Sequence, residues 1–341
     1  MTAISKKCLL LLALFGLSLL FAGEAQCDQL KIYWCDVEGG AATLIVTPQM
    51  ESVLIDAGLP GDRDPARIYR LAKEVAGIER IDHMVATHFD LDHYGGIADL
   101  SRLMPIENFY DPGIPEKHDA KRVGEYKRIS QGKRKVLKPG DEIQLVQGEG
   151  LPALRLHCLG SSQKFVTPPL GADENGLCET HKPMPEDTTE NANSTVLLLN
   201  YGAFDFLDAA DLTWQLEMRL VCPVNLVGTV DVFQVDHHGL NVSNNPVLVG
   251  SLQPRVAVMN NGVSKGCATS TVKTLRNTSS IEAVYQLHRN LPIGGNAPPA
   301  YIANAKADCQ AAHVELTVER LGDSYTVAIP ANAHRELYQS K

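Results

Sequence analysis

The sequence of 341 residues contains no Cys-x-x-Cys pair and no phosphate-binding glycine loop. The first absence removes the commonest spacing of a structural zinc site, and the second argues against nucleotide binding of the P-loop kind. No segment after residue 25 is apolar enough to span a bilayer, so we expect no membrane span in the mature chain. No internal repeat or linker divides residues 28–330, which we therefore take as one domain.

Residues 1–25 are typical of a secretory signal peptide. Two lysines precede an apolar run at residues 8–22, and small residues flank a cleavage point before Gln26. The run is shorter than the ~20 residues that a membrane-spanning helix needs. We expect a secreted or periplasmic protein; the alternative is that the run stays uncleaved as an anchor.

Basic residues are scarce relative to acidic ones. Without residues 1–25 the chain has 29 Lys and Arg against 39 Asp and Glu, and the resulting net charge of −10 repels nucleic acid. One stretch differs, because residues 117–138 hold nine basic residues and two acids. It is either a solvated helix and loop or a patch for an anionic substrate.

Seven cysteines follow residue 25, so disulfide formation would leave at least one of them unpaired.

The strongest functional signal is the segment 87–96. Residues 81–86 predict a buried strand before it, and two glycines at its end predict a tight turn that opens a helix. Histidine nitrogens and carboxylate oxygens on such a loop can bind one or two divalent cations. Four potential ligands lie within six residues: His88, Asp90, Asp92 and His93.

Later strands end in residues of the same kinds. Residues 203–207 predict a strand that is followed by two aspartates, and residues 230–235 predict one that is followed by Asp236-His237-His238-Gly239. We favour His238 as a metal ligand, with His237 second. Asp56 ends the strand predicted at residues 52–55 and is better placed to orient a metal-bound histidine than to bind metal itself.

The segment from His88 to Gly96 resembles the His-x-His-x-Asp-His signature of the metallo-β-lactamase superfamily, with Asp90 in place of the second histidine. It is similar to the hydrolase domain attached to the DNA-uptake channel of bacterial competence, as is His237-His238-Gly239. The resemblance implies an α/β fold, a four-layer αββα sandwich formed by one domain at residues 28–330. Residues 331–341 would be a C-terminal tail.

The resemblance also implies a two-metal site. Asp211 would bridge the metals, with Ala210 where the family has glycine, and Asp208 is the less suited substitute. Catalytic roles would fall to Asp92 and Asp211. The tighter ion would be held by Asp92, His93, His238 and Asp211, and the weaker one by His88, Asp90 and Asp211.

The family usually adds a third histidine to the weaker site, just before the strand that begins here at Thr195. The substitute would be Asn193, or His181 in the long polar segment 160–193, which we expect to form a lid, or water. Because oxygen ligands replace imidazoles, we expect one or two divalent ions, Zn²⁺ first, with Mn²⁺ competitive.

These features predict a secreted metal-dependent hydrolase that uses a metal-bound hydroxide on phosphodiesters, including nucleic acid. Lys265, on the loop after a strand at residues 255–260, could contact an anionic group of the substrate, and Asn193 is a second candidate for substrate binding. The alternatives are a hydrolase of lactones or β-lactams and a non-catalytic binding module that retains the fold. The partner is a small-molecule or nucleic-acid substrate, and no specific protein partner is expected.

Overall fold

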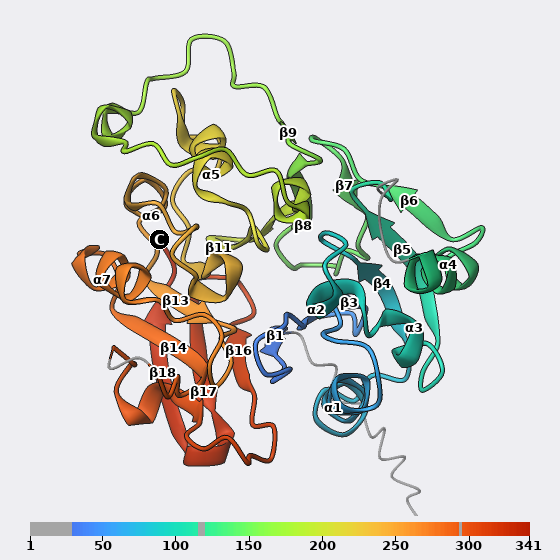
Figure 1. Cartoon of the computed structure of the whole chain (residues 1–341). Coiled ribbons are helices and arrows are strands. Elements are labelled where there is room, and N and C mark those ends of the chain that lie inside the picture. The colour runs from blue at the N-terminus through green and yellow to red at the C-terminus, as the bar shows by residue number, and fades with distance from the viewer. Residues whose placement is uncertain (1–28, 115–119, 293–294) are drawn as a thin grey trace, which may run out of the picture.

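The computed structural model describes residues 29–114, 120–292 and 295–341 (Figure 1). Two mixed β-sheets pack face to face, and each carries helices on its outer face. This is the predicted α/β fold, a four-layer αββα sandwich. Within the described ranges no helix is both long and apolar enough to cross a membrane. The expected signal peptide and Cys27 lie outside the described residues.

Sheet A combines the two ends of the chain. Its first three strands form an antiparallel meander, and the next three add in parallel. The order across the sheet is β18 (His334–Gln339), β17 (Ser324–Ile329), β16 (Val314–Val318), β1 (Leu30–Trp34), β2 (Thr43–Val46), β3 (Ser52–Ile55), β4 (Ile81–Val85), β5 (Ile106–Asp111) and β6 (Arg134–Val136). Its helices are α1 (Arg63–Arg70), continued by η1 (Leu71–Val75), α2 (Leu91–Tyr94), α3 (Ile97–Leu100) and α4 (Ala120–Ile129).

Sheet B holds the middle of the chain, and its strands from β11 to β15 are parallel. The order is β15 (Ile302–Asn304), β14 (Ala283–His288), β13 (Val256–Met259), β12 (Val232–Gln234), β11 (Phe204–Asp208), β10 (Val196–Tyr201), β8 (Leu154–Ser161) and β7 (Glu142–Ile143), with β9 (Lys164–Phe165) paired to β8. Its helices are α5 (Trp214–Val221), α6 (Pro246–Leu252) and α7 (Thr269–Asn277). Short helical turns are η2 (Gly176–Thr180), η3 (Glu190–Asn193), η4 (Asp236–Gly239), η5 (Pro299–Tyr301) and η6 (Pro330–Asn332).

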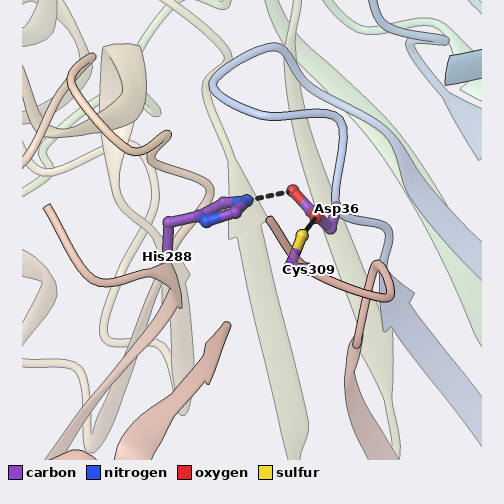
Figure 2. Close-up of side chains that lie close together, drawn as sticks. All are labelled: Asp36, His288 and Cys309. Atoms are coloured by element: carbon purple, nitrogen blue, oxygen red, sulfur yellow. Dashed lines mark hydrogen bonds and ion pairs between the residues drawn. The ribbon is translucent and has the colours of Figure 1, made fainter. Parts of the chain in front are cut away.

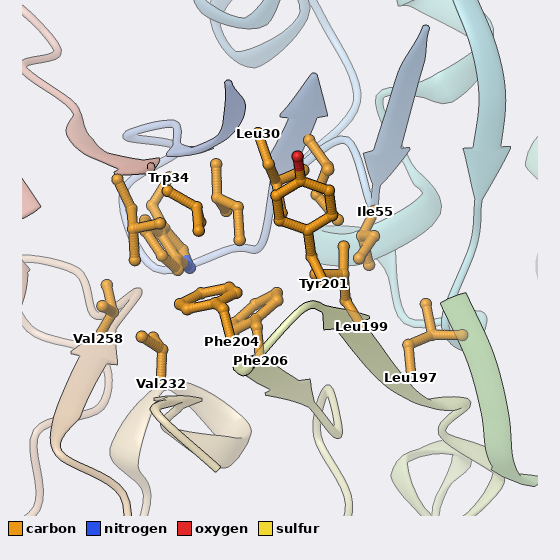
Figure 3. Packing of buried hydrophobic residues seen from close by; sticks show 14 of the residues in the cluster. Leu30, Trp34, Ile55, Leu197, Leu199, Tyr201, Phe204, Phe206, Val232 and Val258 are labelled. Atoms are coloured by element: carbon orange, nitrogen blue, oxygen red, sulfur yellow. The ribbon is translucent and has the colours of Figure 1, made fainter. Parts of the chain in front are cut away.

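The main core lies between the two sheets. Figure 3 shows Leu30 and Trp34 of sheet A facing Phe206 and Val232 of sheet B, and all four side chains are buried. Burying each such side chain contributes about 1.5–3 kcal/mol. The indole of Trp34 donates a hydrogen bond of 2.8 Å to Gln234, so the polar atom of the largest core residue is satisfied.

Two further cores bind the helices to the sheets. The first places Ile68 of α1 and Tyr126 of α4 against sheet A. The second places Leu220 of α5, Leu248 of α6 and Leu275 of α7 against sheet B. Because β3 and β4 are parallel, as are β11 to β14, the carboxyl ends of these strands meet at one edge of the sandwich, where α/β folds place their sites.

Some elements differ from the sequence expectations. The segment expected as a C-terminal tail contains β18, which pairs with β17 at the edge of sheet A. In β18 only Tyr338 is buried, so the strand has little of the apolar alternation that sequence reasoning relies on. The helix expected after the two glycines that end the segment 87–96 is the single turn α3.

Candidate metal centre

Three loops at the ends of β4, β11 and β12 bring the predicted ligands together. The Asp211 Oδ2 atom lies 3.2 Å from His93 Nε2 and 3.3 Å from His238 Nε2. It also lies 3.4 Å from His237 Nε2. The carboxylate of Asp211 is therefore surrounded by three imidazole nitrogens, and both members of the His237-His238 pair face the centre.

Two groups of potential ligands overlap at His93. One consists of His88, His93 and Asp211, and the other of Asp92, His93 and His238; within each group the ligand atoms lie within 4.8 Å of one another. Asp92 Oδ2 is 3.4 Å from His238 Nε2. We call these residues, together with Asp90 and His237, the metal centre.

The donor atoms of the metal centre fit a divalent cation. His88 is fully buried, and its Nε2 atom has no hydrogen-bond partner. The nearest carboxylate oxygen is Asp90 Oδ2, at 3.7 Å. An unpartnered buried nitrogen costs free energy, and a cation shared with Asp90 and Asp211 would satisfy it. The mixture of imidazole nitrogens and carboxylate oxygens suits zinc and also harder ions.

Neighbouring groups fix the orientation of the histidines. Asp56 Oδ2 lies 2.7 Å from His93 Nδ1, and the carboxylate also accepts hydrogen bonds from the backbone N and the Oγ1 of Thr87, at 2.8 and 2.6 Å. His238 Nδ1 lies 3.2 Å from the carbonyl oxygen of Asn260. In both rings Nδ1 is thereby engaged and Nε2 is left to face the centre. Sequence analysis missed Thr87, which lies two residues after β4, and Asn260, which directly follows β13.

The backbone at the centre is strained. Four non-glycine residues adopt positive φ: Asp56 at 60°, Ala210 at 53°, His237 at 52° and His238 at 55°. Each such conformation costs about 1–3 kcal/mol and occurs mainly where function requires it. Close packing holds the histidine turn in place, because a Cβ atom on Gly266 would lie 1.9 Å from the carbonyl oxygen of His238.

The carboxylates and histidines of the centre shift the pKa values of one another. Burial alone would raise the pKa of Asp211, but His238, His93 and His237 outweigh it and lower this pKa well below the usual value. Burial disfavours the charged form of His93, yet Asp211, Asp56 and Asp92 raise its pKa well above the usual value. Each group thus stabilises the charge of the other.

Asp208, the less suited substitute for Asp211, occupies a different position. Burial raises its pKa to about 7, and its Oδ1 atom accepts a hydrogen bond from the backbone N of Ala210. It belongs to neither group of potential ligands. Asp211, three residues further along the chain, reaches the histidines instead.

Lys265 lies at the margin of the centre, where its ammonium forms an ion pair with Asp92. Burial would raise the pKa of Asp92, but His93, His238 and Lys265 lower it far below the usual value. Lys265 therefore brings a positive charge next to a potential metal ligand. Its partner is a side chain of the protein, whereas the sequence suggested an anionic group of the substrate.

Neither candidate for the missing third histidine contacts the centre. The amide of Asn193 is hydrogen-bonded to Gln163 and Glu190 instead of facing the centre. The ring of His181 is hydrogen-bonded to Gln215 and Asn245. Asn191 comes nearer than either, with its Nδ2 atom 3.5 Å from His237 Nε2. Because residues 190–193 form the helical turn η3, Asn191 and Asn193 point in different directions, and it is Asn191 that faces the centre.

The lid was expected over residues 160–193, but β8 extends to Ser161 and β9 occupies Lys164–Phe165. The remaining segment, residues 166–193, loops out over α5 (Figure 1) and is called the lid below. A disulfide joins Cys178 of this segment to Cys222 at the end of α5. The Nε1 atom of Trp214 donates a hydrogen bond of 2.8 Å to the carbonyl oxygen of Lys182. The lid is therefore fixed to the two ends of α5.

The basic stretch is partly neutralised by its own surroundings. The guanidinium of Arg134 forms two hydrogen bonds of 2.5 and 2.6 Å with Asp111. Arg122 forms ion pairs with Asp99 and Glu125. Lys117 lies outside the described residues. The exposed basic residues that remain in the stretch are Lys121, Lys127, Arg128, Lys133, Lys135 and Lys138.

A second polar cluster, which sequence analysis missed, lies after β1 and at the end of β14. Figure 2 shows His288 on one side of Asp36 and Cys309 on the other. His288 Nε2 lies 2.6 Å from Asp36 Oδ1, and Cys309 Sγ lies 3.2 Å from Asp36 Oδ2. Arg67 donates to the same carboxylate at 3.1 Å. Burial would raise the pKa of Asp36, but the hydrogen bond from His288 and the charge of Arg67 lower it. We call these four residues the Asp36 cluster.

Comparison with known proteins agrees with this fold. Residues 35–162 match the family model of the metallo-beta-lactamase superfamily. ComE operon protein 3 of Bacillus subtilis (strain 168) is 23% identical over 261 residues, which are 72% of this chain and 30% of that protein. The chain thus spans less than a third of the length of this curated relative.

Two solved structures are among those to which the chain is similar. The metallo-beta-lactamase fold protein YhfI from Bacillus subtilis is 13% identical, with a TM-score of 0.46, covering 76% of this chain and 96% of that one. CmlA, a diiron beta-hydroxylase from Streptomyces venezuelae, is 15% identical, with a TM-score of 0.41, covering 74% and 52%. The matched family segment contains the loop from His88 to His93, so the part of the chain that carries these candidate ligands is the part that is similar to the metallo-beta-lactamase superfamily.

Proposed function

We propose that this protein is a metal-dependent hydrolase of phosphodiesters, including nucleic acid. The observation that carries the proposal is the convergence of imidazole and carboxylate groups around Asp211, with His88 Nε2 buried and unpartnered. His88, Asp90 and Asp211 would hold one cation, and Asp92, His93 and His238 the other, with Asp211 shared. When bound, such cations lower the pKa of a coordinated water and polarise the scissile bond.

The residues of the chain contribute positioning and charge. Asp56 holds the His93 ring so that Nε2 faces the centre. Lys265, beside Asp92, would favour an anionic substrate at this margin. No serine nucleophile is needed: residues 262–266 have the spacing Gly-x-Ser-x-Gly, but Ser264 is exposed and contacts no histidine among the described residues.

Phosphodiesters are the favoured substrate because the resemblance to the competence-type hydrolases and the oxygen-rich donor set point in the same direction. Carboxylates in place of imidazoles suit hard ions such as Mn²⁺ as well as Zn²⁺. The chain as a whole is acidic, so the substrate would be attracted by the bound metals and by Lys265 rather than by a basic surface.

Export of the protein to a secreted or periplasmic location is part of the proposal. The disulfide between Cys178 and Cys222 supports it, since such bonds persist in oxidising compartments. We expect the intact mass of the exported protein to correspond to a chain that starts near Gln26. A secreted form that retains residues 1–22 would contradict this expectation.

The function is tested with purified protein reconstituted with Zn²⁺ or Mn²⁺. We expect turnover of bis(p-nitrophenyl) phosphate and of single-stranded DNA, and loss of both activities with a chelator. Turnover of lactones or of a chromogenic β-lactam alone would overturn the phosphodiester assignment. Stoichiometric metal binding without turnover of any of these compounds would identify a binding module.

A hydrolase of cyclic esters or amides is the second candidate, because a cavity beside His237 has a largely apolar wall. Met184, Pro185, Trp214 and Val242 line it. A neutral lactone with an acyl chain could use such a wall. The same substrate panel decides between the two candidates.

A further inference from the structure

The cavity beside His237 has a volume of about 300 Å³ and lies between the lid and the body of the domain. The lid contributes Met184, Glu186 and Asp187 to its walls, and the body contributes Trp214 and His237. His237 also lies 3.4 Å from Asp211 in the metal centre. A group bound in this cavity would therefore be held next to the atoms that bind metal.

The walls of the cavity are held in place from both sides. Trp214 donates its backbone N to the carbonyl oxygen of Val242 at 2.9 Å and its indole N to the lid at Lys182. The backbone N of Met184 donates to the side chain of Gln215 at 3.2 Å. With the lid cross-linked at Cys178, the cavity is a preformed feature of the fold.

Two carboxylates give the cavity its polarity. Asp187 is fixed, because its two oxygens accept hydrogen bonds from the backbone N of Thr189 at 2.8 Å and from Thr213 Oγ1 at 3.1 Å. Glu186 is exposed and has no hydrogen bond or ion pair with any described residue. The cavity thus combines an aromatic and aliphatic surface with acceptors, and it offers no cationic side chain.

We propose that this cavity is a subsite for a nucleobase with an exocyclic amino group, that is adenine, cytosine or guanine. The inference rests on the proposed phosphodiesterase function and names the part of the substrate that is recognised. The base would pack against Trp214 and donate its amino hydrogens to Glu186 or Asp187. The attached phosphodiester would then lie at the metal centre, on the other side of His237.

Charge excludes other occupants. A phosphate group or the carboxylate of a β-lactam antibiotic would be repelled by Glu186 and Asp187. Thymine and uracil have no exocyclic amino group and present a single N3–H between two carbonyl oxygens, so a carboxylate that accepts from N3–H would also face an acceptor oxygen on either side. A simple aliphatic amine would match the charge but would leave the apolar wall unfilled.

The chain has a built-in probe for this test. It has two tryptophans, and Trp34 is fully buried in the core, so a ligand in the cavity would change the fluorescence of Trp214 selectively. We would titrate the metal-loaded protein with AMP, CMP, UMP and ribose 5-phosphate. These monoesters are not phosphodiesters and remain intact. We expect AMP and CMP to quench the fluorescence, UMP to bind more weakly and ribose 5-phosphate to leave it unchanged.

Variants separate the contributions of the two walls. Glu186→Gln should weaken AMP and CMP binding by roughly tenfold, as expected for loss of a hydrogen bond to a charged group, and should leave UMP binding unchanged. Glu179→Gln removes the same charge from an exposed position of the lid outside the cavity, and should change neither. Trp214→Ala, measured by calorimetry, should weaken AMP binding about tenfold or more; Trp214→Phe, which keeps an aromatic ring, should retain most of it.

The outcomes distinguish this inference from the proposed function. Turnover of bis(p-nitrophenyl) phosphate together with equal binding of AMP, UMP and ribose 5-phosphate would overturn the subsite and leave the phosphodiesterase intact. Stronger quenching by hexylamine than by AMP would assign the cavity to a cation and overturn it as well. Lactone turnover that depends on Trp214, without phosphodiester turnover, would overturn both.

Discussion

The metal centre and the Asp36 cluster both bring aspartate and histidine side chains together near strand ends, but their carboxylates are satisfied in different ways. In the Asp36 cluster a guanidinium, an imidazole and a thiol surround one carboxylate, which also accepts a hydrogen bond from the backbone N of Glu38. In the metal centre Asp90, Asp92 and Asp211 face histidines, and Lys265 is the cation that contacts one of them. In the Asp36 cluster the protein itself compensates the negative charge of the carboxylate. In the metal centre three carboxylates lie close together, and a bound cation would compensate their negative charge further.

Each site also contains a histidine nitrogen without a hydrogen-bond partner, but only in the metal centre does this nitrogen face a carboxylate. His88 Nε2 lacks a partner and lies 3.7 Å from a carboxylate of the centre. His288 Nδ1 also lacks a partner, but it is the ring nitrogen that does not face Asp36 (Figure 2). Proximity of His, Asp and Cys side chains is therefore insufficient to identify a metal site. The charge balance and the direction of the unpartnered atom distinguish the two.

The largest expected difference comes from making the same substitution in each site. Asp211→Asn should abolish turnover and release metal, an effect beyond the about 10–100-fold loss typical of residues that only support a ligand. Asp36→Asn should keep metal and activity and should lower the free energy of unfolding by about 1.5–3 kcal/mol, the range for hydrogen bonds to charged groups. Metal analysis of the purified variants and denaturant unfolding give the two readouts. Loss of metal in Asp36→Asn would make the Asp36 cluster part of the metal site.

Metal removal should separate the sites again. A cation that binds the folded state alone stabilises it by about 4 kcal/mol when free metal exceeds the dissociation constant 1,000-fold. A chelator should therefore lower the Tm of the wild type and of Asp36→Asn by the same amount, and should leave Asp211→Asn unchanged. A chelator effect that persists in Asp211→Asn would place the stabilising ion elsewhere in the molecule.

The sequence predicted the part of the structure that depends on local pattern. Two local segments were sufficient to predict the fold and the candidate ligands. One is the strand at residues 81–86 with the ligands that follow it, and the other is the strand at residues 230–235 with the histidine turn after it. Asp36 and His288 are 252 residues apart and have no such spacing. Their meeting depends on how β1 and β14 lie in the two sheets, which no local pattern reports.

Similar limits apply to the rest of the centre. The choice between Asn193 and Asn191 depends on the turn of η3, and the partner of Lys265 depends on the approach of two loops from different sheets. Neither can be derived from residue type. The anchoring of the lid by Cys178 and Cys222 was equally out of reach, since seven cysteines allow many pairings.

A smaller effect is expected at the residue that supports His93. Asp56→Asn should lower metal affinity about 10–100-fold, because the ring of His93 would lose the carboxylate that fixes its orientation. Asp208→Asn is the matched control: this carboxylate is also buried at a strand end, but it contacts neither group of ligands. Competition titration with a metal-binding dye gives both affinities. Equal affinities in the two variants would mean that Asp56 only stabilises the turn at Thr87.

The smallest and most specific effect concerns Asp90, at the position where the family signature has histidine. Its side chain is 38% exposed, and its backbone has extended angles (φ −80°, ψ 142°) just before α2, so a histidine can be accommodated there. The nearby His88, whose Nε2 atom lies 3.7 Å from Asp90 Oδ2, lowers the pKa of Asp90 despite partial burial, so this position supplies an anionic oxygen at neutral pH.

As long as that oxygen is present, Mn²⁺ should activate the wild type at least as well as Zn²⁺, because hard ions prefer oxygen ligands. Asp90→His should gain Zn²⁺ affinity and shift activity toward Zn²⁺, while the ion held by Asp92, His93 and His238 stays in place. Calorimetric titration of both proteins with each ion reports stoichiometry and affinity without relying on turnover. If preference and stoichiometry are the same in both proteins, Asp90 is not a ligand, and the centre binds a single ion between His93, His238, Asp92 and Asp211.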